Sequence, residues 1–468
     1  MKPFAQRLFI AVTIFSLPIA YIPAQSKALD WPDWMGKKRD GVWLETGIVE
    51  KFPEGGPEIL WRKPIGVGYT GPSVADGHVY VMDWTVDEKK KKELREKQED
   101  KPKNGIEGTP GYEKVICLSA KDGDVVWQHK YESFYNISYA NGPRTTPVVD
   151  GDHVYTLGAM GKLICFKKKD GKVVWEKDLT TEYKTKPPIW GYASHPLIDG
   201  DRLICTVGGE GSAIVAFDKQ TGKELWKSLT VGDIGYVPPL LFGSGDSQQL
   251  ILWHGDGVSS VSAKDGTENW KTKFPEQKAQ AQATCIAMPK AVGNKLFFTG
   301  FYEGSLLLEV DEKDPTKFKE LYRSTKKDLR AKENLNSLMM TPAVKGGHVY
   351  GVANDTRGNG MLMCAELKTG KKVWTEKTSL GEGGLGFASL FIVANEDRYF
   401  LSNDQGELVI AEMSPEGYKE IDRAKLLEPT HAARGRKVVW SHPAFSGGCM
   451  FARNDKEIIC VDLRAKKK

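Results

Sequence analysis

A tryptophan recurs along this chain at the spacing of one structural repeat. In "CFKKKDGKVVWEKDL", residues 165–179, a small residue precedes an Asp-Gly pair, and Trp175 stands four residues after the Gly. The stretches "CLSAKDGDVVWQHKY" and "AFDKQTGKELWKSLT" follow the same plan upstream and downstream. A spacing that is kept while the residues around it change indicates an internal repeat, and a repeat constrains the fold more than chain length does.

The intervals between these tryptophans, 44 to 52 residues with one period skipped, match one blade of a β-propeller. We expect apolar substitutes at the Trp place in two degenerate repeats, Leu321 in "KDPTKFKELYRS" and Ile421 in "MSPEGYKEIDR". Because each Trp follows the turn between two strands, we expect it to pack between adjacent blades. The expected docking residues are Trp61, Trp127, Trp175, Trp226, Trp270 and Trp374.

A second landmark precedes each Trp: a Pro, a Gly-containing turn, and an apolar pair seven and eight residues after the Pro, as in "TTPVVDGDHVY". The Gly pairs supply the positive φ that tight hairpin turns require. Pro is tolerated at the head of a strand that is the first in its sheet. Each period therefore predicts a four-stranded antiparallel sheet. Eight landmarks are found, at Pro72, Pro147, Pro196, Pro239, Pro289, Pro342, a degenerate copy near Leu390, and Pro443.

The last repeat ends before any Trp strand, while "EGGPEILWRKPIG" near the N-terminus carries a Trp strand with no hairpin before it. We expect this N-terminal strand, with Trp61, to close the ring by pairing with the last blade, which removes exposed sheet edges. The predicted fold class is therefore all-β, an eight-bladed β-propeller of four-stranded antiparallel blades. Asp122, Asp170 and Asp265 are interpreted as turn formers and not as catalytic residues.

Composition and charge limit the function classes. The chain has 468 residues, 49 of them Gly, which favours a turn-rich β fold. The net charge of +5 comes from Lys, Arg, Asp and Glu mixed along the chain, without the basic stripe that nucleic-acid binding would need. A charged segment, residues 87–112, is expected to be a solvated insertion in the first blade with one or two helical turns, or alternatively a partner-docking arm.

The N-terminus has the organisation of a secretory signal. Lys2 and Arg7 precede an apolar run, and small residues follow at positions suited to cleavage. We expect residues 1–28 to be the signal peptide and residues 29–468 the mature propeller, periplasmic or secreted, without a lipid-bearing Cys and without an integral membrane segment after processing. A retained anchor is the alternative.

The seven cysteines and the histidines are explained mainly by the repeat. Cys117, Cys165 and Cys364 each lie ten residues before a docking Trp, and Cys460, Ala216, Ser260 and Ala411 occupy the same slot in other repeats. This slot requires a small residue, so free buried thiols are expected and not disulfides. His78, His153 and His348 share a turn position, whereas His195 and His442 both read Ser-His-Pro at the entrance to an innermost strand. Hydrogen bonding at the channel mouth is the expected role of these two residues. Metal binding is the alternative, and it is less favoured because the sequence offers no third ligand at a fixed spacing.

These turns, hairpins and the closing strand resemble the PQQ-like β-propeller repeat family over nearly all of the mature chain. Its tryptophan-docking motif, A-x-D-x-x-T-G-x-x-x-W, is complete in "AFDKQTGKELW", and "WPDWMGKKRDG" is similar to the opening of a secreted bacterial subgroup. The resemblance implies one of two roles. Quinoprotein dehydrogenases of the family bind pyrroloquinoline quinone and calcium beside a Cys-Cys pair, and this chain has no Cys-Cys. The propeller subunit of the outer-membrane β-barrel assembly machinery binds proteins without catalysis.

We therefore expect a non-catalytic binding or scaffold protein of the cell envelope, with no cofactor and with an envelope protein or a small molecule as its partner. The alternatives are a quinone-dependent alcohol or sugar dehydrogenase, and a protein that binds a carbohydrate or another small ligand. Loops that lead into the innermost strands converge at the channel mouth of a propeller, and convergent concave surfaces are the default binding sites. The expected binding residues are Tyr69, Asn141, Arg144, Trp190, Tyr192, His195, Tyr236, Asn336, Trp440 and His442. The alternative is that these aromatic residues plug the channel or pack on neighbouring blades.

Overall fold

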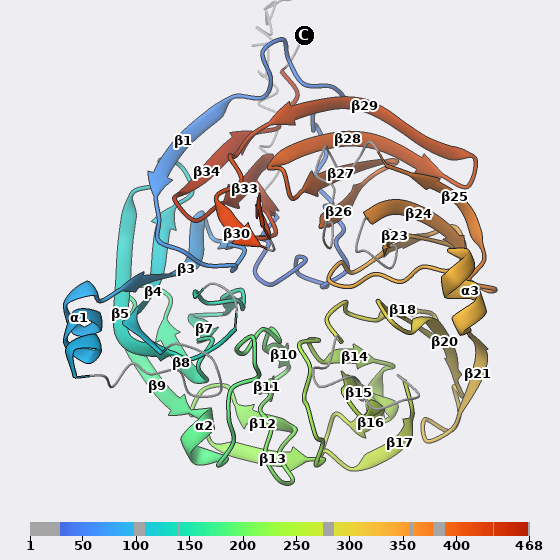
Figure 1. Ribbon diagram of the computed structural model, residues 1–468, viewed down its shortest axis with the longest axis horizontal. Helices are drawn as coiled ribbons and strands as arrows, with labels where there is room; N and C mark the ends of the chain where they lie inside the picture. Colours follow the sequence, from blue (N-terminus) through green and yellow to red (C-terminus); the bar gives the residue numbers. More distant parts are fainter. Residues whose placement is uncertain are drawn as a thin grey trace, which may run out of the picture.

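The computed structural model is a ring of eight four-stranded antiparallel blades around a central axis, which confirms the predicted fold (Figure 1). It describes residues 29–97, 108–138, 141–274, 285–354, 360–377, 389–433 and 435–466. The predicted signal peptide, residues 1–28, lies outside these residues. Across the described ranges, the search for a helix with the length and hydropathy of a membrane span finds none.

In the first seven blades the strands run outward from the axis in the order of the sequence. The first four blades are built from the following strands: β2 (Ser73–Ala75), β3 (His78–Val86), β4 (Thr109–Ser119) and β5 (Val125–Tyr135); β6 (Val148–Asp150), β7 (His153–Leu157), β8 (Lys162–Lys167) and β9 (Val173–Asp178); β10 (Leu197–Asp199), β11 (Arg202–Thr206), β12 (Ile214–Asp218) and β13 (Glu224–Ser228); β14 (Leu240–Phe242), β15 (Gln249–His254), β16 (Gly257–Ser262) and β17 (Glu268–Thr272).

The fifth to seventh blades repeat this plan, and the eighth takes its outermost strand from the N-terminal side of the chain. The strands of these four blades are β18 (Lys290–Val292), β19 (Lys295–Gly300), β20 (Gly304–Val310) and β21 (Phe318–Arg323); β22 (Ala343–Lys345), β23 (His348–Asn354), β24 (Gly360–Glu366) and β25 (Lys372–Glu376); β26 (Leu390–Asn395), β27 (Arg398–Asn403), β28 (Glu407–Ser414) and β29 (Gly417–Lys425); β32 (Ala444–Ser446), β33 (Cys449–Arg453), β34 (Glu457–Asp462) and β1 (Ile59–Pro64).

The innermost strands begin where the proline landmarks predicted. β2, β6 and β32 each start at the residue that follows Pro72, Pro147 or Pro443, and β26 starts at Leu390 in the degenerate repeat. Proline lacks an N–H group, so it can end the connecting loop without leaving a ladder donor unpaired. The proline positions therefore set the point at which each blade begins beside the axis.

The ring closes between its first and last strands, as predicted. β1 pairs with β34 in antiparallel register, and Trp61 lies opposite Cys460. The indole N–H of Trp61 donates to the Ala120 carbonyl of the first blade at 3.0 Å. Closure thus completes the eighth blade through backbone pairing, and it covers the edge that β34 would otherwise expose. One docking Trp then joins this blade to the first.

Docking tryptophans connect several blades to the next one. Trp127 donates from its indole N–H to the Lys168 carbonyl at 2.8 Å, and its ring covers the turn glycine Gly171. A Cβ atom at Gly171 would lie 2.5 Å from that ring, and φ is +69° there, so no larger residue fits this turn without strain. Trp175 repeats both contacts on the following blade. Trp61, Trp127 and Trp175 thus each contact the adjacent blade.

Two substitutes at the Trp place were predicted one residue out of register. Each fourth strand carries a bulge just before its Trp, and in the degenerate blades this bulge falls at Leu321 and Ile421. The residues in Trp register are therefore Tyr322, which lies opposite Leu307, and Asp422, which lies opposite Ile410. Ala411 was predicted to face the Trp place, but it is the residue after Ile410 and lies opposite Glu420. Where the large indole is replaced, the facing slot no longer needs a small residue. Spacing alone could not locate the bulge, since the extra residue changes the pairing without changing the repeat length.

The other elements lie outside the blades or in the loops between their strands. They are α1 (Glu88–Glu96), α2 (Leu179–Glu182), α3 (Lys326–Ala331), the 3₁₀ turn η1 (Gly245–Ser247) and the hairpin of β30 (His431–Ala433) with β31 (Arg436–Val438). α1 follows β3 within the charged segment 87–112, and β4 begins inside that segment at Thr109. All seven cysteines are free and buried in this structure, as predicted.

Candidate functional site

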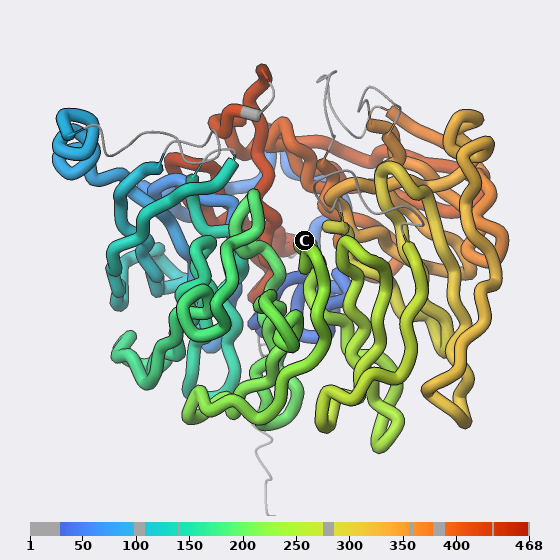
Figure 2. Tube along the Cα trace, turned by 60° about the horizontal axis from the view of Figure 1, so that its bottom comes forward, coloured from blue at the N-terminus to red at the C-terminus, as the bar shows by residue number. Residues whose placement is uncertain are grey.

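The channel of the ring is occupied on one side by the N-terminal segment, residues 31–41. Trp31 pairs with Val74 on the inner edge of β2, and the Pro32 carbonyl accepts from the Val149 N–H at 2.8 Å. In Figure 2 this blue segment lies at the lower centre, while α1 and the β30–β31 hairpin rise at the upper side. The segment therefore fills the axis from the face opposite to the loops that enter the innermost strands.

A buried ion pair anchors this segment. Arg39 lies 3.5 Å from Asp33, and both side chains are almost inaccessible to solvent. Burial raises the pKa of Asp33, against the opposing effect of Arg39, and burial lowers the pKa of Arg39. Arg39 also donates to the backbone carbonyl of His195 at 3.3 Å, which ties the segment to the third blade.

His195 and His442 meet deep in the channel and not at its open surface. Trp34 stacks on His195 with a centroid separation of 4.8 Å, and the two imidazoles are 5.7 Å apart. His195 Nδ1 accepts from the Thr146 N–H at 2.9 Å, and His442 Nε2 is hydrogen-bonded to the Thr146 hydroxyl at 2.8 Å. Burial lowers the pKa of His442 to about 3 and holds the pKa of His195 well below its ordinary value. Both rings are therefore neutral structural groups that bridge blades.

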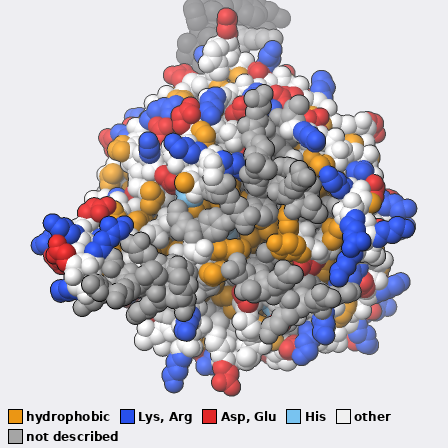
Figure 3. Space-filling model, viewed as in Figure 1, with side chains coloured by type: hydrophobic (Ala, Val, Ile, Leu, Met, Phe, Trp, Pro, Cys, Tyr) orange, Lys and Arg blue, Asp and Glu red, His pale blue; other side chains and the backbone are white. Residues whose placement is uncertain are grey.

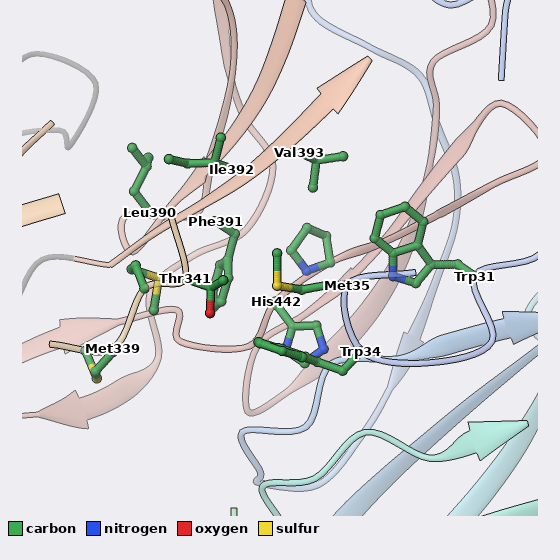
Figure 4. Close-up of a pocket in the computed structure, with 12 residues that line it drawn as sticks. Trp31, Trp34, Met35, Met339, Thr341, Leu390, Phe391, Ile392, Val393 and His442 are labelled. Carbon is green, nitrogen blue, oxygen red and sulfur yellow. The ribbon is translucent and has the colours of Figure 1, made fainter. Parts of the chain in front are cut away.

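A small axial cavity remains between the N-terminal segment and the last three blades (Figure 4). Its volume is about 30 Å³, whereas small-molecule sites usually have roughly 300–1,000 Å³. Trp34, Met35, Phe391 and His442 are among its lining residues, and the lining is almost entirely apolar. This cavity does not fit a planar quinone that carries carboxylates. In the described ranges, no group of three or more His, Cys, Asp or Glu is placed to hold a metal ion.

The open mouth lies on the other side of the ring, and three predicted residues meet there. The guanidinium carbon of Arg144 lies 4.7 Å from the centre of the Tyr69 ring, and Trp440 lies 6.2 Å from the same ring. All three side chains are half-buried. They come from the loops that enter β2, β6 and β32, so residues of the first, second and eighth blades converge here.

Two residues that sequence reasoning missed complete this group. His431 Nδ1 is hydrogen-bonded to Asp455 at 2.9 Å, and His431 Nε2 to the Tyr69 hydroxyl. Asp455 comes from the loop between β33 and β34. Loops between the second and third strands open on the same face as loops entering the first strands, because strand direction alternates across a blade. Inclusion of these second-to-third-strand loops would have identified Asp455.

The remaining aromatic residues of the mouth form a second group. Trp190 stacks on Tyr236 with a centroid separation of 4.9 Å, and the Tyr236 hydroxyl accepts a hydrogen bond from the backbone N–H of Trp190 at 3.4 Å. Burial raises the pKa of Tyr236, against a smaller opposing effect of the Arg144 charge. In Figure 3, hydrophobic side chains show near the centre of this face, and Lys and Arg are more frequent toward its rim.

The structure separates two other predicted residues, Tyr192 and Asn336, from these groups. Tyr192 is 1% exposed, donates to the Val207 carbonyl at 2.8 Å and belongs to the hydrophobic core between the second and third blades. Asn336 is hydrogen-bonded to the backbone N–H and carbonyl of Asn354, and so fastens its own loop to β23. Asn141 lies half-buried in the loop before β6. Tyr192 therefore packs between neighbouring blades, which was the alternative prediction for the aromatic residues.

Comparison with protein families identifies the family of the central part of this chain. Residues 111–376 match the family described as outer membrane protein assembly factor BamB. The protein of that name from Shewanella oneidensis is 25% identical over 225 residues, which are 46% of this chain and 54% of the relative. The one from Burkholderia pseudomallei is 22% identical over 257 residues, 54% of this chain and 60% of the relative. The aligned region thus spans somewhat more than half the length of these curated relatives.

Solved structures of other propellers share the fold. Quinohemoprotein alcohol dehydrogenase from Comamonas testosteroni superimposes with a TM-score of 0.58 at 12% identity, covering 94% of this chain and 81% of the enzyme. A europium-containing methanol dehydrogenase gives a TM-score of 0.55, also at 12% identity, covering 86% of this chain and 84% of the enzyme. At this level of identity the similarity concerns the fold and not the activity.

Proposed function

The chain belongs to the family described as outer membrane protein assembly factor BamB, and from that premise we propose that it is a non-catalytic binding or scaffold protein of the cell envelope. The names of the curated relatives support an envelope protein as the partner class. The signal-like N-terminus supports export to the periplasm or beyond. The mature protein would then act as a rigid ring that presents one face.

The observation that carries this proposal is the filling of the axis. In a propeller enzyme, a cofactor or substrate needs space near the channel. Here, residues 31–41 occupy the channel, and the axial cavity beside them holds about 30 Å³. Interaction is thereby directed to the loops of the mouth face, where half-buried aromatic and charged side chains are available. Such side chains, especially Trp, Tyr and Arg, are the ones that dominate protein interfaces.

The proposal is tested by site-specific crosslinking in living cells. A photo-crosslinking amino acid replaces Tyr302, whose side chain is 60% exposed in the loop between β19 and β20 on the mouth face. The control position is Lys169, exposed in the turn between β8 and β9 on the opposite face. We expect a discrete adduct with an envelope protein from Tyr302 and none from Lys169, and a weaker adduct when Trp190→Ala is added.

Two outcomes would contradict the proposal. Adducts of equal yield from both faces, or none from the mouth face, would mean that this face does not dock a partner. Dye reduction by the purified protein with an alcohol or a sugar, after addition of pyrroloquinoline quinone and calcium, would instead assign it as a dehydrogenase.

A further inference from the structure

The axial cavity gathers soft ligand atoms from three parts of the chain. One methionine of the N-terminal segment, two methionines of the loop that enters β22 and a histidine of the loop that enters β32 line it (Figure 4). They are Met35, Met339, Met340 and His442. Methionine commonly fills irregular gaps in protein cores. Three thioethers and an imidazole around one cavity of about 30 Å³ are also a set of metal donors.

Met35 is held at this cavity by an unfavourable backbone conformation. Its φ is +59°, in the left-handed region that Gly or Asn adopts more easily. The Met35 carbonyl accepts from the Gly41 N–H at 3.0 Å, and a Cβ atom added to Gly41 would lie 2.8 Å from the Met35 Cε. In Figure 4 the Met35 side chain reaches toward His442. Residues in such conformations cluster at functional sites, where the surrounding structure maintains them.

The ring of His442 is oriented through one of its nitrogens. Nε2 is hydrogen-bonded to the Thr146 hydroxyl at 2.8 Å. Gly71 lies against the same side of the ring, since a Cβ atom added there would be 2.4 Å from both Cδ2 and Nε2. Nδ1 is at the opposite side of the ring, and Phe391 of the seventh blade lies 5.7 Å from the imidazole between ring centres. The low pKa of His442 keeps the ring neutral, which is the form that binds metals.

The lining of the cavity restricts which ion fits. Thioether sulfur selects Cu(I), whereas Mg²⁺ and Ca²⁺ need oxygen ligands. No carboxylate is among the lining residues, so the charge of a divalent ion would be buried without compensation. Trp31 and Trp34 add aromatic rings, whose faces attract cations. Met35 and Met339 are only half-buried, so an ion from solvent can reach their side chains.

We propose that the axial cavity binds a Cu(I) ion between the Met35 sulfur and His442 Nδ1. Met339 and Met340 provide further thioethers in the same cavity. Thr146 is a positioning residue, which orients the imidazole through Nε2 as groups behind metal-binding histidines do. Binding is coordination alone, without a redox step. The inference goes beyond the scaffold role and does not depend on it.

The test is competition for Cu(I) between the purified mature protein and the chromophoric chelator bicinchoninate, without oxygen. We expect the protein to withhold one equivalent of Cu(I) from the chelator, and an equal concentration of Zn²⁺ should not displace it. Removal of a group behind a metal ligand already costs roughly 10–100-fold in affinity. Met35→Leu and, separately, His442→Gln each remove a ligand, and each should weaken binding by about tenfold or more.

Two further variants are matched controls. Met363→Leu makes the same change at a fully buried methionine outside the cavity. Cys449→Ala removes the most exposed of the seven thiols, which is 8% exposed, and so tests whether a thiol holds the ion instead. Both variants should withhold Cu(I) as the unmodified protein does.

Three results would overturn the inference. They are no withheld Cu(I) in the unmodified protein, unchanged affinity in both Met35→Leu and His442→Gln, or loss of binding in Cys449→Ala. Thermal unfolding of every variant shows whether it has folded, and if one ligand variant does not fold, the other carries the test. Because no partner protein is present, failure of this inference is distinguishable from failure of the crosslinking test.

Discussion

Trp175 and Trp226 form a matched pair in which only one indole N–H has an acceptor. Both rings are half-buried and cover the turn glycine of the next blade, where an added Cβ would lie 2.7 Å from the Trp175 ring at Gly222 and 2.6 Å from the Trp226 ring at Gly266. Trp175 donates to the Lys219 carbonyl at 3.1 Å. The Trp226 N–H is buried without an acceptor among the described residues. The pair therefore isolates the hydrogen bond from ring packing.

Replacement of each Trp by Phe removes the same atoms, so the loss of apolar contact is similar at the two positions. Trp175→Phe also loses a hydrogen bond, whose net contribution is about 1 kcal/mol, whereas Trp226→Phe removes an N–H whose burial is itself unfavourable. We expect Trp175→Phe to lower the free energy of unfolding by about 1–2 kcal/mol more than Trp226→Phe does. Trp→Ala at either position should cost about 3–5 kcal/mol, because the ring contacts are lost as well.

The assay is urea denaturation followed by circular dichroism, with the slope of each transition compared before free energies are subtracted. Equal destabilisation by the two Phe substitutions, or a larger loss for Trp226→Phe, would refute the reasoning. Blade docking would then depend on ring packing over glycine alone, and the indole hydrogen bond would contribute nothing measurable.

Three further predictions concern the ring as a whole. Deletion of residues 29–66 should expose the edge of β34 and empty the channel, so the protein should become poorly soluble; a soluble variant with unchanged melting would contradict closure by β1. Because an unfolded chain protonates His442 near pH 6.5 and the folded chain only near pH 3, stability should fall as pH falls between these values, by about 1.4 kcal/mol per pH unit. His442→Gln should reduce this slope by close to one proton in pH-dependent denaturation, and an unchanged slope would contradict the prediction. Thiol titration under denaturing, non-reducing conditions should recover all seven cysteines, and recovery of two fewer would indicate a disulfide.

The local signals of the sequence were sufficient for the architecture. Pro72 and Pro147 mark where innermost strands begin, the Asp-Gly turns mark where third strands end, and Trp61 marks the strand that closes the ring. These signals are local because φ preferences, turn chemistry and strand periodicity act over a few residues. Repetition made them stronger, since a pattern seen in several blades predicts the others. The residues that occupy the Trp place in the two degenerate blades escaped prediction, because a bulge is set by pairing with the neighbouring strand.

The composition of the mouth was decided by the tertiary structure. The sequence indicated that Tyr69, Arg144 and Trp440 lie in loops of one face, but not that His431 and Asp455 complete their hydrogen bonds. It also placed His442 at the mouth, whereas the N-terminal segment covers it with Trp34 in the interior of the channel. Contacts of this kind join residues hundreds of positions apart. The ring geometry brings them together, and no local propensity records which loop meets which across the axis. The sequence by itself thus determined the blades and their closure, and only the closed ring determined which side chains share a site.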